Sequence, residues 1–333
     1  MSSTISPSLP PHLPRGPRSV PAPASVPAGM RGLLGGMRAS LRVLWAEAPG
    51  YQRLPYAVGV ALIAVGLAHA VIWAVVGGSA SGPLSWRKPT TFGISFGMTT
   101  VTLGVVASYL PVRRWIGWPV SILLCASTSV EVAWVSLQHA RGVPSHFNDM
   151  TPLDERLFTG GGVSIAVTIL VIIVMTLAAF ARTTAPAPMA WALRSGMVAL
   201  LAAQAVGAWM IVHGLSLVED GASPLTQSMS TYGLAGAMKF AHAVPMHAIQ
   251  VFGVLAWLLG FSGLTQRRQL WLVVMAIAGY AGLFGIALLR TIEGLAPFDL
   301  SVSTLVYLIP CGLLAVSGIT ALVCVYRAAA TRT

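Results

Sequence analysis

Residues 163–181 read VSIAVTILVIIVMTLAAFA, an unbroken run without a single charged side chain. A helix needs about 20 predominantly apolar residues to cross the hydrocarbon core of a bilayer. Backbone polar groups must be paired within the lipid, and a run of this length is too long for a strand of a transmembrane barrel. The stretch therefore predicts a membrane-spanning helix, and with it a helical membrane fold.

The composition of the whole chain agrees with this prediction. Of the 333 residues, 56% are hydrophobic and only 9% are charged, whereas an average soluble domain carries about 25% charged residues. The chain is therefore expected to be an integral membrane protein whose first partner is the lipid bilayer. The same composition disfavours a soluble enzyme, a coiled coil and a nucleic-acid-binding protein.

Seven further segments are long and apolar enough to span a bilayer. The predicted fold class is an all-α integral membrane bundle of about eight transmembrane helices, near residues 56–76, 90–110, 116–138, 163–181, 195–217, 241–261, 270–289 and 302–325. The sequence divides into a disordered Pro-rich cytoplasmic tail (1–29), an interfacial amphipathic segment (30–53), the eight-helix transmembrane domain (54–326) and a cytoplasmic tail (327–333).

The basic residues predict the orientation of the bundle. If the N-terminus is cytoplasmic, 14 of the 20 lysine and arginine residues lie on the cytoplasmic side, as the positive-inside rule requires. An even number of spans then places both termini in the cytoplasm, and the cytoplasmic membrane of the cell is the expected location. The other basic residues lie on the outer side: Arg87, Lys88, Arg141, Arg156, Lys239 and Arg290.

A weak internal parallel suggests two duplicated halves of four helices. The first and fifth predicted spans end near a histidine, His69 and His213, and the second and sixth begin near a lysine and a phenylalanine. The alternative is that this similarity arose by chance.

Four histidines at similar depth are candidate ligands of haem iron, copper or another transition metal: His69, His213, His242 and His247. Neutral imidazole is the commonest metal ligand in proteins. Because Pro245 suits the first turn of a helix, we expect His242 to precede the helix proper and to bend toward a site that His247 also faces. The alternatives are that only one of His242 and His247 is a ligand, or that these are packing histidines bonded to backbone carbonyls.

Glu131 is an ionisable residue inside the third predicted span, where such groups are costly and often functional. Trp134 and Gln138 share its helical face. A carboxyl there is expected to be paired, bound to a metal or protonated, and with His139 it would handle protons. A structural bond to a neighbouring helix is the alternative.

The loop after the third span is dense in donors and acceptors. Together with Lys88, the residues Arg141, His146 and Asp154 would shape an outer pocket, and Gly160 to Gly162 would give the next helix a flexible start. The alternative is an ordinary solvated loop. Trp73, Trp86, Trp134 and Trp209 fit an aromatic belt at the membrane interface.

The strings Arg141-Gly-Val-Pro-Ser-His-Phe-Asn148 and His242-Ala-Val-Pro-Met-His247-Ala-Ile-Gln250 resemble a family of uncharacterised bacterial multi-pass membrane proteins, as do Trp86-Arg-Lys-Pro-Thr-Thr-Phe92 and His213-Gly214. The resemblance covers about residues 55 to 326 and implies that these residues form one site, without naming a reaction. Family members carry a Gly-rich, Asp-containing loop after the His-Gly pair, where this chain reads Leu215-Ser-Leu-Val-Glu-Asp-Gly221.

These observations favour a metal- or haem-dependent membrane oxidoreductase that acts on a small or lipophilic substrate. The cofactor would be haem, copper or iron, and a second copy of the chain or an electron-transfer protein is the expected partner. A small-molecule transporter or exporter is the first alternative, and a metal or pH sensor or assembly factor is the second. The chain has no Rossmann fingerprint and no P-loop, which argues against nucleotide chemistry.

Overall fold

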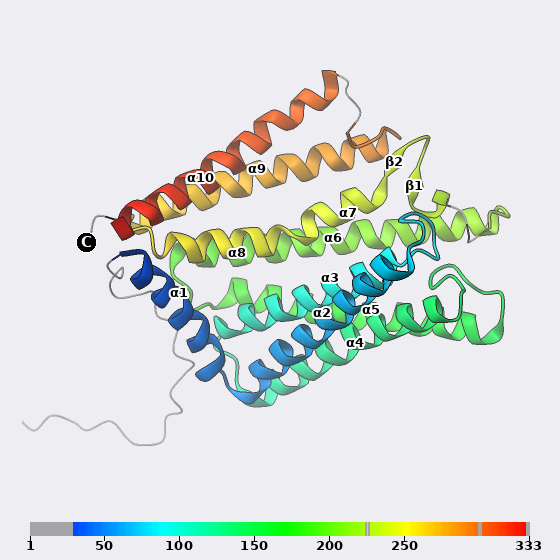
Figure 1. The fold of residues 1–333 in the computed structure, drawn as a ribbon, viewed down its shortest axis with the longest axis horizontal. Coiled ribbons are helices and arrows are strands. Elements are labelled where there is room, and N and C mark those ends of the chain that lie inside the picture. The colour runs from blue at the N-terminus through cyan, green and yellow to red at the C-terminus, as the bar shows by residue number, and fades with distance from the viewer. Residues whose placement is uncertain (1–28, 224, 226, 299–301, 331–333) are drawn as a thin grey trace, which may run out of the picture.

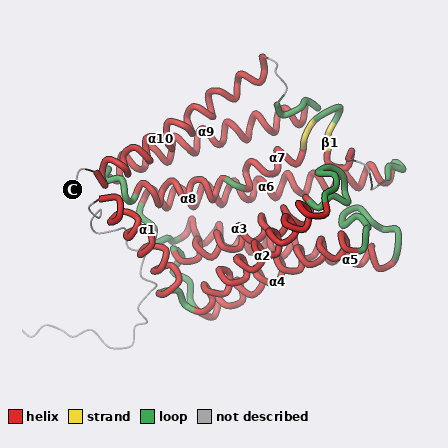
Figure 2. Tube along the Cα trace, in the orientation of Figure 1, coloured by secondary structure: helices red, strands yellow, loops and turns green. Residues whose placement is uncertain are grey.

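The computed structural model describes residues 29–223, 225, 227–298 and 302–330, and it consists almost entirely of helices (Figures 1 and 2). Eight helical segments in this part of the chain are long and apolar enough to cross a membrane. The prediction of an all-α eight-helix bundle is therefore confirmed. The spans are α2 (Gly50–Val76), α3 (Arg87–Ser108), α4 (Arg114–Ala140), α5 (Pro152–Ala181), α6 (Ala187–Glu219), α7 (Met238–Met246) with α8 (Ala248–Leu259), α9 (Gln266–Ile292) and α10 (Leu308–Ala330).

Short elements complete the fold. Helix α1 (Gly29–Ala46) occupies the predicted interfacial segment and packs Leu33 against Phe261 and Val325, at one end of the bundle. At the other end, η1 (Gln227–Ser230) precedes a hairpin of two short antiparallel strands, β1 (Thr231–Tyr232) and β2 (Gly236–Ala237), and η2 (Val302–Tyr307) precedes α10. The Pro-rich tail, residues 1–28, lies outside the described residues.

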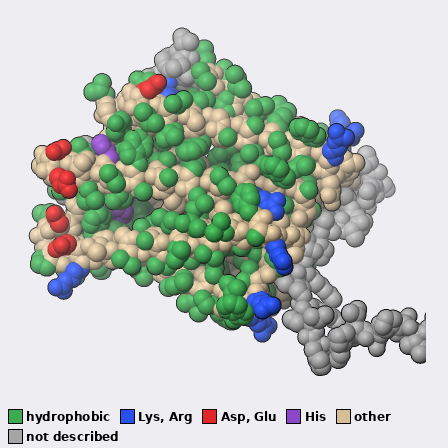
Figure 3. Space-filling view, turned by 180° about the vertical axis from the view of Figure 1, so that it is seen from behind, with side chains coloured by type: hydrophobic (Ala, Val, Ile, Leu, Met, Phe, Trp, Pro, Cys, Tyr) green, Lys and Arg blue, Asp and Glu red, His purple; other side chains and the backbone are tan. Residues whose placement is uncertain are grey.

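The two ends of the bundle differ in charge. Figure 3 shows acidic side chains gathered at one end and most of the basic side chains at the other. We call the end formed by residues 77–86, 141–151, 220–223, 227–237, 293–298 and 302–307 the acidic end, and the opposite end the arginine-rich end. The positive-inside rule predicts that the arginine-rich end faces the cytoplasm.

The helices pack as two halves, which meet chiefly through α5 and α6. In the first half α2 packs on α3, and both of them and α5 contact α4; in the second, α6 packs on α7, α8 and α9, and α9 on α10. The boundary between the halves coincides with the predicted division into four and four helices.

The main hydrophobic core lies mostly in the arginine-rich half of the bundle. Leu103 and Leu110 at the end of α3 join the same cluster as Phe252 and Leu259 of α8, and all four side chains are buried. Toward the acidic end the halves separate, and Figure 3 shows a hollow between them in which a histidine side chain is visible. Burial of apolar surface therefore joins the halves mainly toward the arginine-rich end.

Two local predictions are wrong. Helix α5 begins at Pro152, so Gly160 to Gly162 lie within a helix and give it no flexible start. Its N-terminus is set by the Thr151 hydroxyl, which accepts a hydrogen bond from the Asp154 amide at 3.2 Å, and by the proline in the first turn. His242 lies inside α7, and the helix breaks at His247 because Pro245 lacks the amide hydrogen that would continue the ladder.

Candidate functional site

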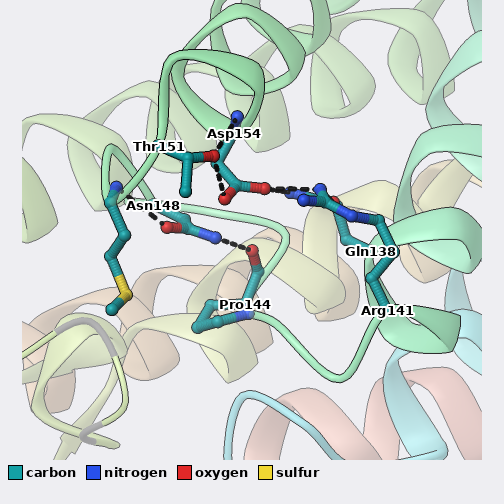
Figure 4. A network of polar contacts seen from close by, with 7 residues as sticks. Gln138, Arg141, Pro144, Asn148, Thr151 and Asp154 are labelled. Atoms are coloured by element: carbon teal, nitrogen blue, oxygen red, sulfur yellow. Dashed lines mark hydrogen bonds and ion pairs between the residues drawn. The ribbon is translucent and has the colours of Figure 1, made fainter.

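A network of polar contacts fixes the loop between α4 and α5 (Figure 4). The carboxylate of Asp154 accepts hydrogen bonds from Gln138 Nε2 at 2.9 Å, Arg141 Nη1 at 2.5 Å and Thr151 Oγ1 at 2.6 Å. Arg141 also donates to Gln138 Oε1. The structure thus brings together two predicted site residues, Arg141 and Asp154, as an ion pair that joins the end of α4 to the start of α5.

The tip of this loop is held by Asn148 and by a close approach to α6. The buried Asn148 amide donates to the Pro144 carbonyl at 3.0 Å and accepts from the Met150 amide at 3.2 Å. Phe147 has a φ of 57°, in the left-handed region. Its ring lies so close to Gly214 that a Cβ atom there would stand 2.4 Å from the ring. This contact explains why a glycine follows His213.

The loop presents His146 to a cluster of aromatic rings. The His146 imidazole stacks on Trp134 with 4.8 Å between ring centroids and meets Phe92 edge-on at 5.7 Å. Ser145 Oγ lies 3.1 Å from its Nδ1. Burial, and then the charges of Lys88 and Lys239, hold the pKa of His146 well below its usual range. His146 is therefore a neutral imidazole near pH 7.

Two lysines face this histidine from the two halves of the bundle. Lys88 lies at the start of α3 and Lys239 at the start of α7. Each acts electrostatically on His146, and Lys239 also acts on Lys88. Sequence reasoning named Lys88 as a site residue but missed Lys239. The signal that would have found it is composition, because these are the only lysines in the chain.

Trp134 belongs to the site, and its prediction as a belt residue is wrong. Its side chain is only 6% exposed, and its ring covers Gly161 of α5, where a Cβ atom would stand 2.4 Å away. Its indole Nε1 is buried and, within the described ranges, has no hydrogen-bond partner. Trp86, another predicted belt residue, instead lies beside His139, with ring centroids 4.1 Å apart, and near His69.

Glu131 lies one turn deeper than Trp134 on the same face of α4. The carboxyl is 3% exposed and accepts a hydrogen bond from the hydroxyl of Ser164 on α5. The contact is the structural bond to a neighbouring helix that was the alternative for this residue. Deeper still, Thr168 donates to Ser127 at 2.8 Å. The polar residues of α4 therefore continue along the α5 interface to the middle of the span.

The four candidate ligand histidines have separate surroundings. His242 Nδ1 donates to the Ala203 carbonyl at 2.7 Å, and His213 Nε2 donates to the Thr231 carbonyl at 3.1 Å. Within the part of the chain that the structure describes, no three His, Cys, Asp or Glu side chains are grouped so as to hold a metal ion. The haem or metal site remains a prediction, as does proton handling by Glu131 and His139.

No protein-family model matches this chain, and comparison with curated proteins and with solved structures returned no match. The function must therefore be argued from the site itself.

Proposed function

We propose that this chain is a small-molecule transporter, arranged here with its site open toward the acidic end. The observation that carries the proposal is the asymmetric packing of the two halves: a shared apolar core seals the arginine-rich half, and a hollow separates the halves near the acidic end (Figure 3). Alternating access in many transporters is the rocking of one helical repeat or bundle against another around a fixed site.

The position of the polar side chains supports the same function. Polar residues from both halves lie toward the acidic end, with Lys88 and His146 in the first half and Lys239 in the second, and both lysines act electrostatically on His146. Transporter sites often lie near the midplane, and the hydroxyl groups of Ser127 and Thr168 extend the polar face of α4 to that depth.

Distances between spin labels in the two halves test this proposal. After the three native cysteines are replaced by serine, one pair is introduced at Leu137 and Leu289, near the acidic end, and a matched pair at Trp115 and Trp271, near the arginine-rich end. All four side chains are exposed, so labels there leave the packing intact.

A transporter predicts two populations of distances for the acidic-end pair, with the matched pair changing in the opposite sense. Since interconverting states separated by a few kcal/mol populate the minor one at about 0.1–10%, measurements at several pH values and in both detergent and nanodiscs are needed. One unchanged narrow distance in both pairs under all these conditions would contradict the proposal.

A metal- or haem-dependent oxidoreductase is the second candidate, favoured by one observation. His242 and His213 each donate one ring nitrogen to a backbone carbonyl, which leaves the other nitrogen as a lone-pair donor, as is usual for metal-ligating histidines. A visible spectrum and elemental analysis of the purified protein test this. Haem or near-stoichiometric copper or iron that is lost in His213→Ala and His242→Ala supports it, and a colourless, metal-free protein after reconstitution contradicts it.

A further inference from the structure

We propose that the site at the acidic end binds a small organic anion, a carboxylate or phosphate monoester joined to an apolar group, between Lys88 and Lys239. The proposal rests on the transporter function and names the class of substrate.

The first support is the convergence of the two lysines. They are separated by 150 residues in the sequence and belong to different halves of the bundle, yet Lys239 acts electrostatically on Lys88, and Arg87 acts on both. The remaining 18 basic residues of the chain are arginines. In their charged forms the two amino groups repel each other, and an anion bound between them would relieve that repulsion.

The second support is the lack of an acidic partner within the described residues. The single ion pair that the structure shows there joins Arg141 to Asp154. The carboxylate of Asp154 is engaged by three side chains, and that of Glu131 lies deeper, bonded to Ser164. His146, which faces both lysines, is neutral and adds no negative charge. Since no described carboxylate pairs with the two lysines, a bound ligand would supply the negative charge.

The third support identifies the apolar part of the ligand. Lys88, Phe92 and Phe96 follow one another at four-residue spacing, so they lie on one face of α3. The rings of Phe92 and Phe96 are 5.6 Å apart and half-buried, and Phe92 also contacts His146. An anion held by Lys88 would place its attached group over these rings, deeper in the bundle.

The fourth support is an unused donor in the same cluster. Trp134 stacks on His146, and its buried Nε1 has no hydrogen-bond partner among the residues that the structure describes. Buried polar groups are almost always hydrogen-bonded. An oxygen atom of a bound carboxylate or phosphate would satisfy this donor, which an apolar ligand would leave unpaired.

Calorimetric titration of the purified full chain with benzoate, phenyl phosphate and neutral benzamide tests the inference. Wild-type protein is expected to bind at least one anion and to bind benzamide at least about tenfold more weakly, because a hydrogen bond to a charged group is worth more than a neutral one. Lys88→Gln and Lys239→Gln should each weaken anion binding about tenfold or more. Lys88→Arg should retain most of it. Arg156→Gln, which removes an exposed charge at the same end, is the matched control and should bind like wild type.

Any of three results would overturn the inference. These are equal binding of benzamide and benzoate, no binding of either anion, and a loss of anion affinity in Arg156→Gln equal to that in the lysine variants. A lysine variant that fails to fold is replaced in the comparison by the other one and by Lys88→Arg. If the protein binds the anions but the spin labels show a single distance, the anion site stands and the transporter function is contradicted. If the spin labels show two distances but no anion binds, the transporter function stands and the anion site is contradicted.

Discussion

At the scale of single residues, His146 shows how a loop side chain becomes part of a membrane-embedded site. Its ring is surrounded by aromatic side chains and faces two lysines, so burial and like charge both disfavour its protonated form. A neutral imidazole has one donor and one acceptor nitrogen, and Nδ1 already contacts Ser145 Oγ at 3.1 Å. The residue therefore suits recognition of an uncharged or anionic group, and it does not add to the repulsion.

The lowered pKa of His146 predicts a pH dependence of stability. The unfolded chain takes up a proton at its ordinary pKa of about 6.5, and the folded protein does so only at lower pH. The contribution is fully present above about pH 6.5 and is lost as the pH falls toward the folded-state pKa. Thermal unfolding in detergent, followed from about pH 7.5 to about pH 5, should show a smaller decrease for His146→Gln than for wild type. Equal decreases would show that His146 is not held in its neutral form.

Gly214 gives a second prediction at this scale. A methyl group there meets the ring of Phe147, so Gly214→Ala should destabilise the protein by about 1–3 kcal/mol, the usual cost of overpacking. Gly253 on α8 has open space around its Cβ position, and Gly253→Ala should be neutral or stabilising by about 0.5–1 kcal/mol. Thermal unfolding of the two variants checks this. A similar loss in both would mean that the Phe147 contact does not matter.

Residue-level reasoning from the sequence singled out side chains that are costly in lipid and missed those whose role depends on their neighbours. Glu131 and His146 stand out because ionisable groups in or near spans are rare. Trp134 does not stand out, because the sequence cannot distinguish an interfacial tryptophan from a buried one. Its burial depends on Gly161 of α5, which packs against the ring. Lys239 enters the site only because α7 packs in the other half, which no local pattern reveals.

At the scale of elements, the loop between α4 and α5 is the structural unit that positions His146 and Phe147. The Asp154 carboxylate links the two helices that flank the loop. It accepts hydrogen bonds from Gln138 and Arg141 at the end of α4 and from Thr151 at the start of α5. The motif around Arg141 is therefore explained as a means of fixing the loop, and Arg141 and Asp154 act as positioning residues.

Asp154→Asn should loosen this loop. The amide loses the negative charge that Arg141 pairs with and can no longer accept through both oxygens. Hydrogen exchange of peptides that cover residues 141–151 is expected to speed up, while exchange in the middle of α4 stays unchanged. Glu155→Gln, at the exposed neighbouring position, is the control and should exchange like wild type. Unchanged exchange in Asp154→Asn would contradict the positioning role.

The helix boundaries show what local sequence can predict. Hydropathy located α5 but missed its first turns, because Gly160 to Gly162 resemble a break. The stronger signal was Thr151-Pro152 with acids in the first turn, a regular helix N-terminus. Pro245 does mark a break, but it lies near the C-terminus of α7. This helix begins directly after the β hairpin, at Met238.

At the scale of the whole molecule, the lipid environment makes the fold class predictable. Every backbone group in the hydrocarbon core must be paired within its own helix, so apolar length alone gave eight spans. How these helices pack does not follow from apolar length, because lipid-facing and core-facing positions are both apolar. The separation of the halves at the acidic end, and hence the site, therefore needed the structure.

The most direct test of the account is uptake of radiolabelled benzoate into proteoliposomes that contain the full chain. The account predicts uptake above that of empty liposomes for wild type and for Arg156→Gln, and uptake reduced at least about tenfold for Lys239→Gln, whose binding energy for the anion is weakened. Wild-type uptake equal to that of empty liposomes, with benzoate binding intact, would contradict transport and leave a membrane protein that binds an anion without moving it.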